Sequence, residues 1–339
     1  MKFWPLIKVL PVRTHFRFIR LSRLFAVLSV VAIAGSLWLA LVPFQPPCGG
    51  LACGIDFKGG SVLELTTAPN PADIGKIRGV VTGMHLGDVQ AQGFSNPSSA
   101  MVRFQTPAGA DPSATAERVK AQIAAAVSPV KFTRTDVVGP KVSGELLRSG
   151  LMALGGAILL MLLYIWFRFE LQFGLGAVAA LFHDVILTFG LIGLTNKLSV
   201  LTGGAVRPIE MNLQAVAAIL TIIGYSMNDT VVVFDRFREN LRKYKRMPLG
   251  EVIDMSINEM LTRTIITSLT AIIALAALAL LGGPELYGLS VIMLFGICIG
   301  TYSSIYIAAP VIMLWGVKRS DEEAEPIAPP PGVRRPVAR

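Results

Sequence analysis

Charge is scarce in this sequence, and histidine and cysteine are scarcer. Only 16% of the 339 residues are charged and only three each are histidine and cysteine, whereas 53% are hydrophobic and the mean hydropathy is +0.60. A soluble chain of this length carries about 25% charged residues, because its surface is in contact with water. The shortage of charge therefore excludes an ordinary soluble protein.

Long apolar segments account for the high hydropathy. A helix needs about 20 apolar residues to cross a hydrocarbon core about 30 Å thick. Such segments recur six times, at Leu24–Val42, Leu151–Phe167, Leu171–Leu194, Met211–Phe234, Ile265–Leu281 and Leu286–Trp315. We therefore expect an α-helical polytopic membrane protein with six transmembrane helices, of which helices 2–6 occupy residues 148–317.

The basic residues predict the topology. The net charge of +9 is concentrated on alternate connections, which is the positive-inside pattern and not a nucleic-acid surface. It places both termini in the cytoplasm. The basic stretch 1–23 before the first span is long for the n-region of a signal peptide, and no convincing A-x-A cleavage site follows, so we expect the first span to remain as an anchor. The inner-side residues are Lys2, Lys8, Arg13, Arg17, Arg20, Arg23, Arg168, Arg236, Arg238, Arg242, Lys243, Lys245, Arg246, Lys318 and Arg319.

Residues 43–147 do not resemble membrane spans. Alternating and helical hydrophobic patterns predict the order β-α-β-β-α-β, a small ferredoxin-like α+β domain on the periplasmic side. The predicted strands are Ser61–Thr67, Val89–Phe94, Met101–Gln105 and Lys131–Val138, and the predicted helices are Pro71–Met84 and Asp111–Val127.

Two further regions are predicted to be cytoplasmic. The connection 236–259 is expected to extend the fourth span before the chain turns back. The tail 318–339 is charged and then proline-rich, which predicts disorder. The sequence shows no strong internal repeat. If the chain is half of a pseudo-symmetric transporter, the other half is therefore a different polypeptide.

The three cysteines allow more than one interpretation. Cys48 and Cys53 follow the first span, in a compartment where a disulfide persists. Their spacing, with no histidine nearby, is poor for zinc. A local disulfide and two free thiols both remain open. Cys298, in the last span, is interpreted as a small packing residue.

Ionisable residues inside the spans are the candidate functional residues. Asp184 lies in mid-segment beside His183, Asp229 follows Asn228, and Arg263 begins the fifth span. A charged carboxylate near the bilayer centre costs about 2.5–3.5 kcal/mol, so such residues usually mark a proton or ion pathway. Three structural alternatives remain open: Asp229 pairs with Arg263, His183 or a threonine satisfies Asp184, and Arg263 extends to the interface. The pattern also places Asp229 about 10 Å from the midpoint of its segment.

Common enzyme signatures are missing. No G-x-x-x-x-G-K-[ST] sequence occurs, which excludes a P-loop, and no H-E-x-x-H sequence occurs. Intramembrane aspartyl proteases usually carry Gly-x-Gly-Asp, whereas Leu-Phe-His-Asp ends at Asp184 and Ser-Met-Asn-Asp ends at Asp229. We therefore expect no enzyme activity and no cofactor or metal.

Five segments are specific in combination. They are Gly54–Gly60 (Gly-Ile-Asp-Phe-Lys-Gly-Gly), Trp166–Glu170, His183–Val185, Tyr225–Arg236 and Leu261–Thr264. This set resembles the SecF family of the bacterial SecDF protein-export complex, within the resistance–nodulation–division superfamily. The resemblance covers nearly the whole chain except the tail. The cysteine pair and the proline-rich tail depart from the family pattern.

The resemblance implies a function and its partners. It implies a subunit that uses the proton-motive force to promote late steps of polypeptide export across the bacterial inner membrane. SecD would supply the other six spans, and the complex would work with the SecYEG channel, the SecA motor and the exported polypeptide, without nucleic acid. The rival functions are half of a proton-coupled small-molecule efflux transporter and a purely structural assembly subunit.

The resemblance also implies roles for individual residues. It assigns the proton pathway to Asp229, Arg263 and Asp184, with Asn228, Thr230 and His183 in support. The outer motif supplies Gly54, Asp56 and Phe57. Gly59 and Gly60 are either a hinge to the outer domain or a turn before the first strand.

Overall fold

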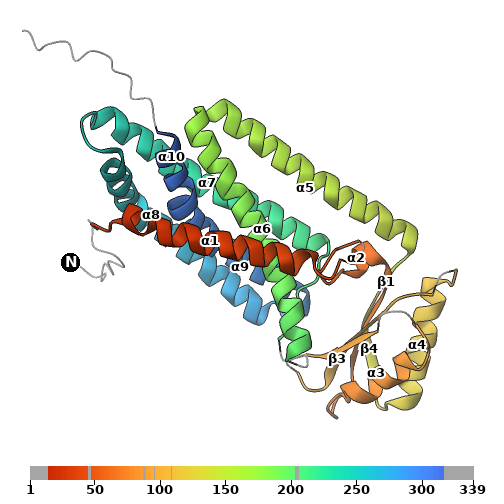
Figure 1. The fold of residues 1–339 in the computed structure, drawn as a ribbon. Helices are drawn as coiled ribbons and strands as arrows, with labels where there is room; N and C mark the ends of the chain where they lie inside the picture. The colour runs from red at the N-terminus through yellow and green to blue at the C-terminus, as the bar shows by residue number, and fades with distance from the viewer. Residues whose placement is uncertain are drawn as a thin grey trace, which may run out of the picture.

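The computed structural model describes residues 14–44, 47–86, 89–94, 96–107, 109–202 and 206–316. Within these ranges the chain forms a bundle of long apolar helices with a small α/β domain at one end (Figure 1). The basic residues before Thr14 and the tail after Gly316, with its predicted disorder, lie outside the described residues.

The described chain contains six helices long and apolar enough to cross a membrane, which confirms the predicted number. Most are longer than the apolar segments, because a helix continues beyond the point where charged residues begin. They are α1 (Phe18–Leu41), α5 (Pro140–Arg168), α6 (Leu171–Leu201), α7 (Leu213–Lys243), α8 (Leu249–Leu281), and a composite of α9 (Gly283–Ser303), the π-helical turn η1 (Ser304–Ala308) and α10 (Ala309–Trp315). The connection 236–259 is therefore mostly helical, with Tyr244–Pro248 between α7 and α8.

The bundle is organised around α6 and α7. Helix α1 packs along α6, and α9 packs against both α7 and α8. Close approach depends on glycine: a Cβ atom added to Gly190 of α6 would lie 2.8 Å from the Cα atom of Ser36 in α1. Small residues of this kind let membrane helices pack where lipid provides no hydrophobic driving force. Helix α1 begins, and α10 ends, at the end of the bundle opposite the α/β domain (Figure 1).

The α/β domain has the predicted βαββαβ order. It comprises β1 (Gly60–Thr66), α3 (Ile74–Thr82), β2 (Gln90–Gly93), β3 (Ser99–Phe104), α4 (Pro112–Ala126) and β4 (Lys131–Val138). The sheet order is β2-β3-β1-β4 with antiparallel neighbours, as in a split βαβ sandwich. Asp73 and Asp111 cap the two helices. The domain has a hydrophobic core of its own, separate from that of the bundle.

The cysteines adopt one of the two states that the sequence left open. Cys48 and Cys53 form a disulfide, with their Cα atoms 5.7 Å apart. Cys298 is exposed on α9, so its interpretation as a packing residue is wrong for the isolated chain. Its side chain lies on the outside of the bundle, because the face of α9 that contacts α7 is formed by Gly296 and Gly300.

Candidate functional site

Asp229 lies where three apolar helices meet. It is the half-buried seventeenth residue of the 31 in α7. Its carboxylate accepts hydrogen bonds from the Thr264 hydroxyl of α8 at 3.1 Å and from the Ser304 hydroxyl of η1 at 3.0 Å. The apolar pattern placed Asp229 off-centre, but α7 as a whole is centred near it because the helix continues to Lys243.

Arg263 is not bonded to Asp229. Its side chain is exposed on α8, and among the described contacts it interacts with Asp229 only through space. Asn228 is also exposed, whereas Thr230 is buried and donates to the backbone carbonyl of Ser226 at 3.1 Å. The charged and amide groups beside Asp229 therefore face away from this bundle.

Asp184 is enclosed by the bundle. It is 1% exposed on α6, and one carboxylate oxygen accepts from Ser226 of α7 and, at 2.7 Å, from Ser303 of α9. The other oxygen lies 2.8 Å from Nδ1 of His183. The expected histidine contact is thus present, while the nearby Thr188 donates to the backbone carbonyl of Asp184 instead of its carboxylate.

His183 extends this network to α1. Its Nε2 atom lies 3.3 Å from the Ser29 hydroxyl, which lies 2.7 Å from the Tyr302 hydroxyl. If Tyr302 donates to the Phe25 carbonyl, 3.0 Å away, Ser29 donates to Tyr302 and a protonated Nε2 donates to Ser29. If Tyr302 donates to Ser29, Ser29 donates to an unprotonated Nε2. Hydroxyl rotation therefore lets Ser29 and Tyr302 stay hydrogen-bonded to either tautomer of His183, although the second arrangement gives up the Tyr302–Phe25 bond.

The two carboxylates are joined through adjacent serines. Ser303 ends α9 and donates to Asp184, and Ser304 begins η1 and donates to Asp229. A π-helical turn widens the backbone by one residue and occurs often at functional sites. The sequence interpretation assigned no role to either serine or to Ser29, and it included Ser226 and Thr264 only as members of the motif segments. Hydroxyl side chains are common in apolar spans, so no single one of them signals a site.

The Gly-Ile-Asp-Phe-Lys-Gly-Gly motif forms the connection between the domain and the bundle. A short helix, α2 (Ile55–Lys58), which the sequence did not predict, places Phe57 in the bundle core. The Asp56 carboxylate accepts from the backbone N–H of Leu213 at 3.0 Å, at the first residue of α7. Gly59 and Gly60 have φ angles of 74° and 126°, which favour glycine. A hinge at these glycines stays a prediction.

The fold and the internal carboxylates define a class: a six-span membrane subunit with a hydrogen-bonded polar network in its bundle and one small α/β domain. Residues 118–318 match the family described as "Protein export membrane protein SecD/SecF, C-terminal". The chain is 38% identical to protein translocase subunit SecF of Rickettsia akari over 322 residues, covering 94% of this chain and 97% of that protein. It is 41% identical to SecF of Cereibacter sphaeroides over 325 residues, covering 92% and 93%. The chain belongs to the SecF family of protein translocase subunits.

Solved structures show the same fold within a longer chain. The crystal structure of SecDF from Thermus thermophilus, described as a translocon-associated membrane protein, matches with a TM-score of 0.75 and 29% identity, covering 90% of this chain. A structure of SecDF in a super-membrane-facing form matches with a TM-score of 0.57 and 27% identity, covering 92%. The chain spans 39% and 40% of the lengths of those two proteins.

Proposed function

We propose that this chain is the SecF subunit of a Sec protein-export complex and that Asp229 carries protons whose movement promotes polypeptide translocation. Membership of the SecF family supports the export role, and does not favour small-molecule efflux. The same family relationship supports a SecD partner. The SecYEG channel, SecA and the exported polypeptide complete the proposed set of partners, and no catalytic step is assigned to the chain.

The observation that carries the proton role is the convergence of three helices on one carboxylate. Asp229 of α7 is held by Thr264 of α8 and Ser304 of η1. Both hydroxyls donate to the charged carboxylate, whereas a protonated carboxyl has a proton of its own to donate. Protonation of Asp229 therefore weakens the hydrogen bonds from Thr264 and Ser304 that hold α7, α8 and η1 in this arrangement. A helix bundle with two such states responds to proton binding by a shift in population.

The exposed residues beside Asp229 support a site completed by a second subunit. Asn228 and Arg263 face outward, and exposed apolar residues, including Ile266, Leu269 and Ile273, continue along α8. Charge at such a position is costly in lipid, unless a partner or water surrounds it. We propose that SecD spans cover this face and that Arg263 acts at the interface. Asp184 and His183, in contrast, form a proton-holding pair inside this chain.

The proposed location is the bacterial inner membrane. The basic residues described near the start of α1 and at the α7–α8 connection lie at the end of the bundle opposite the α/β domain, as the positive-inside rule predicts. We therefore assign both termini to the cytoplasm and the α/β domain to the periplasm.

The decisive experiment compares two aspartates of the same helix. Asp229→Asn and Asp235→Asn are each reconstituted with SecD in proteoliposomes, and proton flux is measured alongside export in a SecF-depleted strain. Asp235 lies on α7 and pairs with Arg168 at 2.7 Å on the exposed surface, so its variant should keep both activities. Asp229→Asn should assemble normally and lose both proton flux and proton-dependent export. Wild-type flux in that variant would refute the proton role.

A further inference from the structure

A buried arginine connects the α/β domain to the bundle. Arg103 of β3 is 8% exposed. Its guanidinium pairs with the carboxylate of Glu210 and donates to the backbone carbonyl of Cys53. Glu210 precedes α7 by three residues, and Cys53 is held in the disulfide with Cys48. One side chain of the domain thus binds two segments that belong to the bundle.

The two segments that Arg103 contacts, Ala52–Asp56 and Glu210–Leu213, are hydrogen-bonded to each other and form a short junction. The backbone N–H of Met211 donates to the Ala52 carbonyl at 2.7 Å, and the N–H of Gly54 donates to the Met211 carbonyl at 2.8 Å. Asp56 accepts from the N–H of Leu213 at 3.0 Å. A Cβ atom added at Gly54 would lie 2.7 Å from that of Asn212, so the two segments are in direct contact. Any displacement of the start of α7 therefore moves this junction.

Stability alone does not explain this partly buried pair, in which the Arg103 side chain is 9% exposed and that of Glu210 is 25% exposed. Burial raises the pKa of the Glu210 carboxyl despite the neighbouring Arg103, so desolvation outweighs the attraction. An ion pair that has lost water in this way adds little net stability, and in some proteins such pairs fix a geometry instead. The pair is suited to holding the domain in one position relative to α7.

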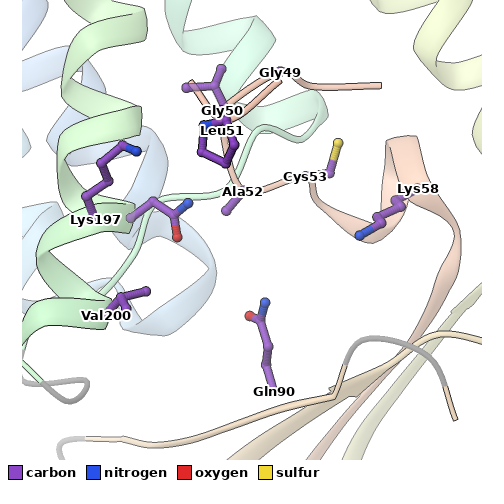
Figure 2. Close-up of a pocket in the computed structure, with 11 residues that line it drawn as sticks. Gly49, Gly50, Leu51, Ala52, Cys53, Lys58, Gln90, Lys197 and Val200 are labelled. Atoms are coloured by element: carbon purple, nitrogen blue, oxygen red, sulfur yellow. The ribbon is translucent and has the colours of Figure 1, made fainter. Parts of the chain in front are cut away.

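The domain also contacts the bundle elsewhere. Arg207, in the segment before α7, lies over the ring of Phe94, which follows β2, and over the ring of Tyr287 in α9. Arg134 of β4 and Glu285 of α9 pair at 2.8 Å, but their side chains are 42% and 41% exposed, so that pair contributes little. Towards α6 there is a cavity of about 390 Å³ between the domain and the bundle, which Figure 2 shows between Gln90 below and Lys197 and Val200 on α6. Arg103 is thus the side chain that joins the domain to both of these segments, and a cavity lies on the α6 side.

We propose that Arg103, Glu210 and Asp56 are positioning residues that transmit displacement of α7, the helix of Asp229, to the α/β domain. This inference rests on the proposed proton role of Asp229. Removing the contacts of Arg103 should separate proton flux from proton-dependent export, which normally occur together. Protons should still cross the bundle, while the domain no longer responds.

The test is Arg103→Met in the full SecF chain, reconstituted with SecD. Methionine keeps an apolar stem of similar length but removes both polar contacts. Proton flux should stay within about twofold of wild type. Proton-dependent export should fall about 5- to 150-fold, which is the factor that a typical coupling free energy between two sites produces. Arg134→Met is the matched control at the same interface, and both of its readouts should stay within about twofold of wild type.

Amide hydrogen exchange tests the junction directly. Exchange at Met211 and Leu213 should be faster in Arg103→Met and unchanged in Asp229→Asn. If Arg103→Met fails to fold, Glu210→Met, which removes the carboxylate that pairs with Arg103, replaces it with the same expected results. Normal export in the folded variant would overturn the inference, and so would equal loss of flux and export. Wild-type flux in Asp229→Asn would instead refute the proton role, while the exchange data would still decide whether Arg103 holds the junction.

Discussion

Ser303 and Ser304 are adjacent in the chain, yet their hydroxyls donate to carboxylates on two different helices. Ser303 bonds to Asp184 of α6 and Ser304 to Asp229 of α7. The backbone changes from α-helix to π-helix between them. A shift of this turn therefore affects both carboxylates at once, which directly links enclosed Asp184 to half-buried Asp229.

Removing the Ser304 hydroxyl should impair proton movement. Ser304→Ala leaves charged Asp229 with one donor fewer, and a hydrogen bond to a charged group contributes about 1.5–3 kcal/mol. Because about 1.4 kcal/mol corresponds to a tenfold rate change, proton flux should fall about tenfold or more. The control is Ser268→Ala, which removes a hydroxyl that bonds Thr301 in the same bundle at 2.8 Å and touches neither carboxylate. Equal flux in the two variants would contradict this role of Ser304.

His183 should stabilise the enclosed acid. His183→Leu removes the partner of one Asp184 oxygen and the contact with Ser29 of α1. A buried group left without its partner costs about 1–3 kcal/mol, so the melting temperature of the purified subunit in detergent should fall. His85→Asn is the control, because His85 is exposed with a φ of 53°, a conformation that asparagine tolerates. An unchanged melting temperature in His183→Leu would show that the network does not contribute to stability.

Much of the architecture could be predicted because its signals are local. The apolar segments identified the six spans. In the α/β domain, alternating hydrophobic residues identified the strands, and hydrophobic residues at helical spacing identified the helices. Asp184, His183 and Asp229 were recognisable because a titratable residue inside an apolar span is costly. The sequence was less informative about length: α7 continues past Phe234 to Lys243, which is why Asp229 is closer to its centre than the apolar segment indicated.

The rest of the site depends on helix crossings that no local pattern specifies. Ser303 meets Asp184 across 119 positions of sequence, and Ser304 meets Asp229 across 75. The residues of η1 are compatible with an ordinary α-helix, so nothing in them signals a π-helical turn. For Arg263 the sequence left open both a pair with Asp229 and an extension to the interface, and its side chain is exposed on α8 in the isolated chain.

Gly190 should be intolerant of a methyl group. Its added Cβ atom would lie 2.0 Å from Oγ of Ser36, and close to the α1 backbone, so Gly190→Ala should force α1 away from α6. Overpacking typically costs about 1–3 kcal/mol and should lower the melting temperature. Gly35→Ala is the control on α1, because nothing lies within 4 Å of its added Cβ atom. Alanine also favours the helix there, so that variant should melt at or above the wild-type temperature, and a similar loss in both would contradict the packing argument.

The disulfide should be detectable by counting accessible thiols. Alkylation of the denatured, unreduced protein should modify one of its three cysteines, Cys298, and prior reduction should expose all three. By restricting the unfolded chain, a disulfide that closes so short a loop adds about 2 kcal/mol to the free energy of unfolding. The double variant Cys48→Ser/Cys53→Ser should therefore melt at a lower temperature than wild type. Because Cys53 also provides the carbonyl that accepts from Arg103, amide exchange at Met211 should be faster in this double variant than in wild type. Three modified thiols without reductant would show that the bond does not form in the isolated protein.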